Sequence, residues 1–348
     1  MGYTVRPIDP QFLAEEVLSL WSRNLPQATF ERYAWLYGRS AASRAWLLLG
    51  PNLRAIGSTG LMPRRMSLCG ATHECGSAID LNVDREHRTV GPALALQRSL
   101  VRDAAQGNLP LIYALPSPNA VPVMRRLGYV AIGEMRRWAK PLLAERKLRS
   151  VLKRRWLSYP AGFFADKWLE ISSAERRFSL PDGWTFELAA GFNSEFDALW
   201  NRTRGAFGVV GERTTAYLNW RYRDYPDWAS RLYSLLDSRG HLHGYAVICV
   251  QGELANVSDL WFDDDQSLHA VVGAILRTGR AERWAAVSFP VLAGPRVTDV
   301  LARFGMTPRE DVRQVFAWLS PTLDAETRRV ILDGTAWYLT KADSDTDV

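Results

Sequence analysis

The residues best suited to chemistry lie in one stretch, Ile79–Leu100, where a strand pattern passes through a glycine-containing turn into a helix pattern. Ile79, Leu81 and Val83 alternate with other residues, and this period of two indicates a β-strand. After Gly91 the apolar residues recur with helical spacing. A turn between a strand and a helix leaves free backbone N–H groups at the positive end of the helix dipole, which binds anions and phosphate above all. The same order of elements also occurs without a ligand.

The turn resembles the acyl-CoA pyrophosphate loop of the GNAT (GCN5-related N-acetyltransferase) superfamily. That loop has the pattern Arg/Gln-x-x-Gly-x-Gly/Ala and follows a strand that ends in valine. In this chain Arg88, Gly91 and Ala93 occupy the three positions, and Val83 ends the strand. The resemblance implies that acetyl-CoA or another acyl-CoA is the co-substrate.

A second motif extends the resemblance beyond the loop. GNAT proteins continue with a strand, an asparagine and a helix that ends in Leu-Gly-Phe, and this chain supplies Asn119 and Leu127-Gly128-Tyr129. The resemblance implies that the strand backbone polarises the thioester carbonyl, that loop N–H groups hold the pyrophosphate, and that Asn119 orients the pantetheine arm or the leaving group. The cofactor-binding residues that it implies are Leu81, Val83, Arg88, Thr89, Val90, Gly91, Ala93 and Asn119.

Acyl transfer to an amine also requires a group that removes a proton from the amine. Glu74 and Asp80, on the strand before the loop, are the catalytic candidates together with Asn119. His73 and His87 are further possible bases, and a water-mediated base also satisfies the chemistry. Each of these side chains has an ordinary surface role as its alternative. GNAT enzymes often use a tyrosine as the general acid that protonates the leaving thiolate. This chain has Met124 at that position, which cannot donate a proton.

Composition limits the class of protein. The chain has 348 residues, of which 47% are hydrophobic and 23% charged, and this balance is typical of a folded globular protein. The formal charge of +6 permits anionic partners without selecting one. The three cysteines form no metal-binding pattern, so we expect no metal and a reduced compartment. No segment has signal-peptide or membrane-spanning character, so we expect a cytoplasmic protein.

The order of expected elements indicates an α/β class (α+β, mixed sheet). The first 140 residues end in an expected closing pair of strands, Tyr129–Gly133 and Met135–Ala139. A similar order of elements begins again at Gly183. We therefore predict two tandem GNAT-like domains, residues 1–140 and 182–348, joined by a basic and aromatic helical linker at 141–181.

The second copy lacks the pyrophosphate loop. Asp263-Asp264-Asp265 stands where the phosphates would lie, so we expect this domain not to bind acyl-CoA in the manner of the family. The three acids are either a cation site or caps of a helix N-terminus. The acidic tail Asp343–Asp347 is expected to be a frayed end.

The leading hypothesis is an acetyl (acyl) transfer from CoA to an amine. A Tyr-Leu-x-Trp-Arg-Tyr element resembles one in GNAT-like proteins of bacterial polysaccharide synthesis, so the preferred acceptor is an amino sugar or polysaccharide precursor, contacted by Trp220 and Tyr222. The basic linker, residues 145–168, either contacts a membrane surface or is solvated. One alternative is FemAB-like aminoacyl transfer, although the CoA-type loop disfavours tRNA as a partner. Another is a non-catalytic acyl-CoA-binding scaffold. The oligomeric state is left open.

Overall fold

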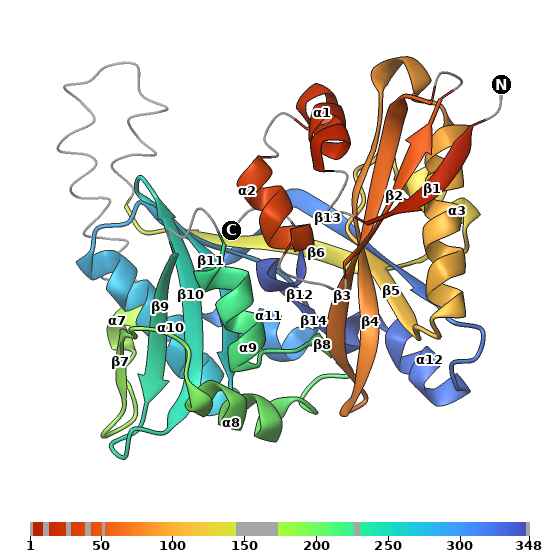
Figure 1. Ribbon diagram of the computed structural model, residues 1–348. Coiled ribbons are helices and arrows are strands. Elements are labelled where there is room, and N and C mark those ends of the chain that lie inside the picture. Colours follow the sequence, from red (N-terminus) through yellow and green to blue (C-terminus); the bar gives the residue numbers. More distant parts are fainter. Residues whose placement is uncertain are drawn as a thin grey trace, which may run out of the picture.

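Figure 1 shows the computed structural model, which describes residues 3–9, 14–25, 29–38, 43–50, 53–143, 173–225 and 230–345. The basic segment at 145–168, with its predicted membrane contact, lies outside these ranges. Among the helices in the described ranges, none combines the length and the apolar composition needed to cross a bilayer.

The first half of the chain, up to residue 143, alternates strands and helices. Its elements are β1 (Thr4–Ile8), α1 (Ala14–Asn24), α2 (Phe30–Tyr33), the π-helix η1 (Ala34–Gly38), β2 (Arg44–Leu49), β3 (Ala55–Leu68), β4 (Ala71–Val83), the 3₁₀-helix η2 (Arg85–His87), α3 (Val90–Gln106), β5 (Leu111–Ala114), α4 (Val121–Arg126) and β6 (Val130–Pro141).

The second half, from residue 173, has a similar order with a C-terminal addition. Its elements are α7 (Ala174–Arg177), β7 (Thr185–Leu188), α8 (Ser194–Thr203), β8 (Val209–Gly211), α9 (Thr215–Leu218), the π-helix η3 (Asn219–Arg223), β9 (Ser230–Leu236), β10 (Leu242–Gln251), β11 (Leu254–Phe262), α10 (Asp265–Ala281), β12 (Ala286–Ala293), α11 (Pro295–Arg303), β13 (Thr307–Leu319), α12 (Ala325–Leu332), η4 (Gly334–Ala336), β14 (Trp337–Leu339) and η5 (Lys341–Asp343).

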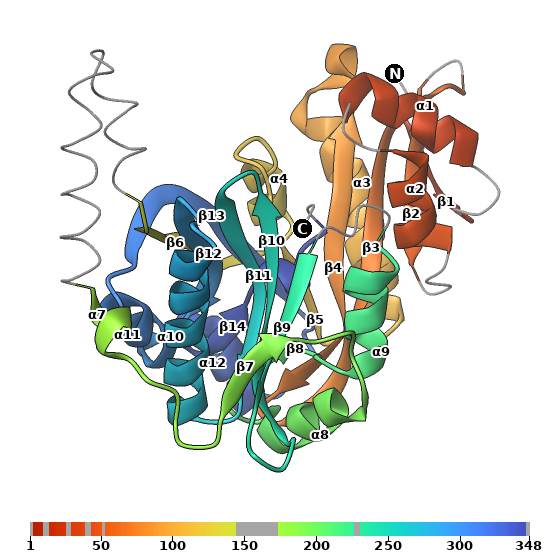
Figure 2. The same cartoon turned by 90° about the vertical axis from the view of Figure 1, so that its left-hand side faces the viewer.

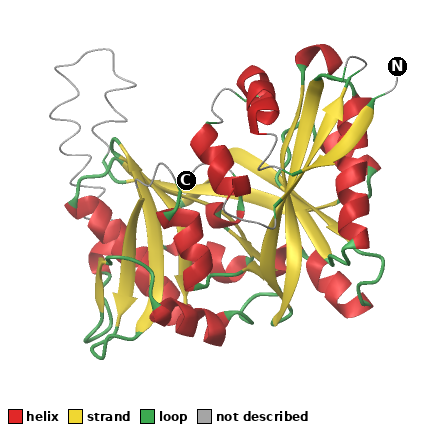
Figure 3. Cartoon of the chain, viewed as in Figure 1, coloured by secondary structure: helices red, strands yellow, loops and turns green. Residues whose placement is uncertain are grey.

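The strands, drawn yellow in Figure 3, form one mixed sheet. Their order is β1-β2-β3-β4-β5-β13-β6-β12-β11-β10-β9-β7, and β8 and β14 branch from it. Most neighbours are antiparallel, whereas β4 with β5, β11 with β12 and β8 with β14 are parallel. The predicted α/β class with a mixed sheet is confirmed. In Figure 2, α3 covers β3 and β4 of the first half and α10 covers β10 and β11 of the second. Leu96, Leu100 and Ala104 explain the position of α3, because their four-residue spacing makes one fully buried face.

The two halves exchange their last long strands. β6 pairs with β12 of the second half, β13 pairs with β5 of the first, and β6 and β13 pair with each other across the middle of the molecule (Figure 1). The predicted closing pair, Tyr129–Gly133 with Met135–Ala139, is therefore wrong. These residues form the single strand β6, because the partner that completes the pair comes from the other end of the chain.

The repeat extends to irregular features. Each half places a π-helix after a short α-helix, η1 after α2 and η3 after α9. Each half also has an irregular strand register just before its long helix. The irregularity lies near Asp80 in β4, before α3, and near Ser258 in β11, before α10. The division into two domains at the predicted boundaries stays a prediction, since the exchanged strands make the sheet continuous.

The end of the chain, residues 337–345 (the C-terminal segment), lies between the halves. β14 pairs with β12 and β8, and η5 follows it. Asp343 has no exposed surface and Ser344 is buried. The expectation of a frayed acidic tail is therefore wrong for Asp343–Asp345, because two buried arginines need the charge of Asp343. Thr346 and Asp347 lie outside the described ranges.

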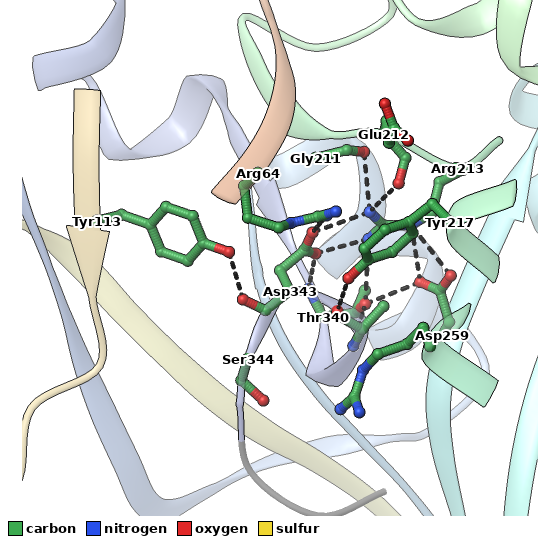
Figure 4. A network of polar contacts seen from close by, with 12 residues as sticks. Arg64, Tyr113, Gly211, Glu212, Arg213, Tyr217, Asp259, Thr340, Asp343 and Ser344 are labelled. Atoms are coloured by element: carbon green, nitrogen blue, oxygen red, sulfur yellow. Dashed lines mark hydrogen bonds and ion pairs between the residues drawn. The ribbon is translucent and has the colours of Figure 1, made fainter. Parts of the chain in front are cut away.

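These charges form a central ion cluster of Arg64, Arg213, Asp259 and Asp343 (Figure 4). Arg64 Nη2 donates to Asp343 Oδ1 at 2.7 Å, and Arg213 Nη2 donates to Asp343 Oδ2 at 2.6 Å. Arg213 Nε lies 3.0 Å from Asp259 Oδ2. Tyr113 Oη donates to the carbonyl oxygen of Asp343 at 2.5 Å. Two positive and two negative side chains from distant parts of the chain thus neutralise one another in the interior.

Burial alone would raise the pKa of Asp343, but the charges of Arg213 and Arg64 outweigh it and hold that pKa below the ordinary value of 3.8. The resulting stabilisation is complete above pH 3.8 and is lost as the pH falls further, through the lower pKa of the folded protein.

Removal of the Asp343 carboxylate should therefore destabilise the protein strongly. Asp343→Ala leaves two buried arginines opposite one carboxylate, and we expect the free energy of unfolding at pH 7 to fall by about 3–5 kcal/mol. Urea denaturation at pH 7 and at about pH 3 measures the effect, and the difference from wild type should narrow at the lower pH. Asp311→Ala is the control, because it removes a largely exposed partner of Arg137 and should cost at most about 1 kcal/mol. Equal losses in the two variants would contradict a structural role for the cluster.

The strand exchange predicts that the first half does not fold alone. A chain of residues 1–143 exposes the edge of β5 and leaves β6 without a partner, and such edges aggregate. We expect disordered or aggregated material by circular dichroism and light scattering, and recovery of a folded complex on co-expression with residues 144–348. A stable folded monomer of residues 1–143 would show that the exchange is dispensable.

Candidate functional site

A β-bulge lies in the middle of β4, at the stretch that the sequence singles out. Ser58 pairs with Asn82 and Gly60 pairs with Ile79, so Thr59 alone opposes two residues, Asp80 and Leu81. Asp80 has a φ of +53°, the left-handed region that non-glycine residues rarely adopt. Gln97 Nε2 donates to Thr59 Oγ1 at 2.7 Å from α3, which fixes the strand opposite the bulge.

Beyond the start of β4 the strand pairing with β5 stops. β4 and β5 pair only at Gly76 with Ile112 and at Ser77 with Tyr113. We call the unpaired stretch from Ile79 to Val83, on the side facing β5, the first gap. Within the part of the chain that the structure describes, no strand pairs with β4 there. The backbone of Leu81–Val83 is thus the place where an extended ligand can add hydrogen bonds, as the resemblance implies.

The loop after β4 leads into an uncapped helix. Thr89 is the N-cap of α3 but its side chain makes no capping bond, so the N–H groups of Val90 and Gly91 have no intrahelical acceptor. Gly91 is exposed, and nothing lies within 4 Å of the position that a Cβ would take. These two N–H groups and the helix dipole can bind an anion.

The other predicted loop residues serve the loop itself. The N–H groups of Arg88 and Thr89 donate to Arg85 O and His87 O, and that of Ala93 belongs to the first helical bond. Arg88 Nε donates to Val83 O at 2.9 Å, and its Nη2 donates to Asn24 Oδ1. Arg88 therefore fastens the loop to the end of β4.

The structure separates the two predicted carboxylates. Asp80 lies at the bulge, where its Oδ1 accepts from Arg32 Nη1 at 3.0 Å and its Oδ2 accepts from Tyr37 Oη at 2.8 Å. Burial raises the pKa of Tyr37 well above its ordinary value, so Tyr37 stays a donor. Glu74 lies six residues earlier on β4, about 20 Å along an extended strand, and is 67% exposed opposite Arg65. The structure thus places Asp80, and not Glu74, beside the first gap.

The remaining candidates of the first half lie on separate elements. Asn119 is exposed in the turn before α4. Met124 is buried in the core between α3 and α4, so this position offers no proton donor. His73 lies near the start of β4, and His87, in η2, contacts Tyr3.

Sequence reasoning missed Arg32 and Tyr37, which reach Asp80 from α2 and η1. No local signal predicts these contacts, since about 45 residues separate the partners along the chain. Gly60 leaves room for Tyr37, because a Cβ at residue 60 would collide with Tyr37 Oη.

The second half satisfies its equivalent helix start from within. Asp264 caps α10: its Oδ1 accepts from Ser267 N at 2.8 Å, and Ser267 Oγ accepts from Asp264 N at 2.7 Å. The capping interpretation is confirmed for Asp264, whereas Asp263 accepts from Arg202 and Asp265 accepts from Arg296. Over the described ranges, no three His, Cys, Asp or Glu side chains are grouped closely enough to hold a metal ion.

The C-terminal segment occupies the position in the second half that corresponds to the first gap. β11 and β12 pair only from Leu254 to Asn256, and we call the stretch beyond it the second gap. Tyr338 Oη donates to Leu260 O at 2.5 Å, and Thr340 Oγ1 donates to Asp259 Oδ1 at 2.8 Å. The chain itself thus takes one main-chain carbonyl and one carboxylate of β11 in the second gap.

The predicted acceptor residues have different surroundings. Trp220 stacks on Trp35 with ring centroids 4.7 Å apart and joins η3 to η1. Tyr222 is fully buried in the core of the second half, against Phe192. Its placement leaves no surface for contact with an acceptor.

Comparisons with known proteins were made by sequence and by structure. No protein-family profile matches the chain, and no curated protein matches it. Solved structures do match. A protein of unknown function from Enterococcus faecalis V583, a probable N-acyltransferase, is 13% identical with a TM-score of 0.66, over 92% of this chain and 72% of that one.

Two further structures show the same likeness. A GCN5-related N-acetyltransferase from Anabaena variabilis is 12% identical with a TM-score of 0.66, over 91% of this chain and 73% of that one. The Saccharomyces cerevisiae N-myristoyltransferase with bound myristoyl-CoA is 11% identical with a TM-score of 0.55, over 96% of this chain and 89% of that one. The chain has the fold of the GCN5-related N-acetyltransferases.

Proposed function

We propose that this protein transfers an acyl group, acetyl in the first instance, from acyl-CoA to an amine. The observation that supports this most is the combination, in the first half alone, of an unpaired stretch of β4 and an uncapped helix N-terminus next to it. Leu81 and Val83 would bond the pantetheine arm and polarise the thioester, Val90 and Gly91 would bind the pyrophosphate, and Asn119 would lie near the leaving group.

A single cofactor site per chain follows from the contrast between the halves. In the second half, Asp264 and Ser267 satisfy the start of α10, and Tyr338 and Thr340 bond to β11. A pyrophosphate there would also face the carboxylates of Asp263–Asp265. The second half would instead support the acceptor side, through Trp220 and the C-terminal segment.

An amino sugar or polysaccharide precursor remains our proposed acceptor class, on the resemblance of the element that contains Trp220. Because Met124 is buried and offers no proton, the CoA thiolate would be protonated through solvent.

The lack of a proton donor at Met124 also favours a second candidate function, a non-catalytic acyl-CoA-binding scaffold. Release of CoA thiol from acetyl-CoA with a panel of amino sugars distinguishes the two: the enzyme gives acceptor-dependent release, and the scaffold gives none.

The cofactor site is tested by Gly91→Glu. An added carboxylate fits into open space in the first turn of α3, where acids favour a helix, so the fold should persist. The same charge next to the pyrophosphate costs about 4 kcal/mol at 4 Å for an effective dielectric constant of 20. Isothermal titration should therefore show acetyl-CoA binding to the wild type and at least about 100-fold weaker binding to the variant.

Gly191→Glu is the matched control, because it adds the same charge at an open position of the second half. We expect it to bind acetyl-CoA like the wild type. Absence of binding to the wild type, or equal binding by Gly91→Glu, would rule out the proposed site.

A further inference from the structure

Two arginines connect the C-terminal segment to the two bulges. In the second half, Arg213 joins Asp259, which follows the bulged Ser258, to Asp343. In the first half, Arg32 joins Asp80 in the bulge of β4 to Asp345. Each half thus has one arginine between a carboxylate of its own bulge and a carboxylate of the C-terminal segment.

The arrangement in the second half is closed. Arg213, Asp259 and Asp343 have no exposed side-chain surface. Asp259 also accepts from Tyr245 Oη and Thr340 Oγ1, each at 2.8 Å, and Asp343 accepts from Arg64. Its carboxylates have all the donors that they need, so this arrangement is structural.

The arrangement in the first half is partly exposed, and among the described residues fewer donors reach the carboxylate of Asp345 than reach that of Asp343. Both oxygens of Asp80 have close donors, Arg32 on one and Tyr37 on the other. Asp345 is held through its main chain, where Arg32 Nη2 donates to the carbonyl oxygen at 3.1 Å. Asp345 Oδ2 lies 3.6 Å from the same nitrogen, Arg32 Nη2, and the side chain of Asp345 is 23% exposed. One carboxylate at the first-half bulge therefore retains capacity for a further donor.

We propose that Asp345 is the catalytic base of the first half, a carboxylate from the far end of the chain that binds the ammonium group of the acceptor beside the β4 bulge and takes its proton. The proposal rests on the proposed acyl transfer. Asp80 is then a positioning residue that holds Arg32 and Tyr37, and Arg32 positions the main chain of Asp345.

The carboxylate of Asp345 takes one proton from the ammonium, and the neutral amine attacks the thioester carbonyl carbon. The N–C bond forms and the C–S bond breaks. The nitrogen loses a second proton, the CoA thiolate gains one through solvent, and Asp345 returns its proton to solvent.

The charges around Asp345 suit this role. The groups that face it are Arg32 of α2, Asp80 of β4, Tyr37 of η1 and Arg221 of η3. Burial and the negative charge of Asp80 raise the pKa of Asp345 to about 6, against the opposing effect of Arg32 and Arg221. A carboxylate in this range can both accept and release a proton near neutral pH.

The test uses the full chain with ¹³C at the side-chain carboxyl of aspartate, as wild type, Asp345→Asn and Asp311→Asn. The carboxyl resonance of Asp345 is the one that is missing from Asp345→Asn and present in Asp311→Asn. In the wild type it should titrate near pH 6. It should also shift on addition of ethylammonium chloride but not of potassium chloride. A titration near the ordinary value of 3.8, or no response to ethylammonium, would overturn the proposal.

Acetyl-CoA binding by the same three samples separates this proposal from the proposed function. Asp345→Asn should bind acetyl-CoA like the wild type, because Asp345 lies on the acceptor side. Failure of the wild type to bind would contradict the proposed acyl transfer. A loss confined to Asp345→Asn would contradict the role of Asp345.

Discussion

Four charged side chains without contact with water determine how this chain is assembled. Arg64, Arg213, Asp259 and Asp343 come from β3, the start of α9, β11 and η5, and none is tolerable in the interior without the others. Gly211 belongs to the same constraint, because a Cβ there would collide with Arg64 and Asp343. The cluster therefore holds the C-terminal segment between the halves, and the segment's other contacts follow from that position.

Two of those contacts give the halves different properties. On one side, Tyr338 and Thr340 bond to β11 and complete the second gap. On the other side, Asp345 reaches Arg32 and the bulge of β4. The two halves have a similar order of elements, and the C-terminal segment bonds to β11 in the second half while it brings Asp345 next to Arg32 in the first. The first half keeps the open gap and the uncapped helix start.

Local features of this structure follow from the sequence. The alternation in Ile79–Val83 predicts β4, the apolar spacing after Gly91 predicts α3, and the acids of Asp263–Asp265 predict a capped helix, as observed. Each depends on neighbours within a few residues. The family resemblance also led to the correct fold, since its motifs span the same strand, loop and helix.

Contacts between residues far apart along the chain do not follow from the sequence in this way. The exchange of β6 and β13 depends on pairing between residues about 180 positions apart, and the alternating pattern of a strand does not name its partner. The burial of Asp343 depends on arginines 130 and 279 residues away. The acidic composition of the tail gives no sign of such partners, and the sequence likewise does not indicate the contact of Arg32 and Tyr37 with Asp80.

We expect the chain to hold one acyl-CoA, in the first gap, because its own C-terminal segment occupies the second gap. A crystal structure of the full chain with acetyl-CoA tests this expectation. The pantetheine arm should lie along Leu81–Val83 and the pyrophosphate at Val90 and Gly91, with Tyr338 still bonded to Leu260. Cofactor in the second gap with residues 337–345 displaced, or no cofactor in the first gap, would contradict it.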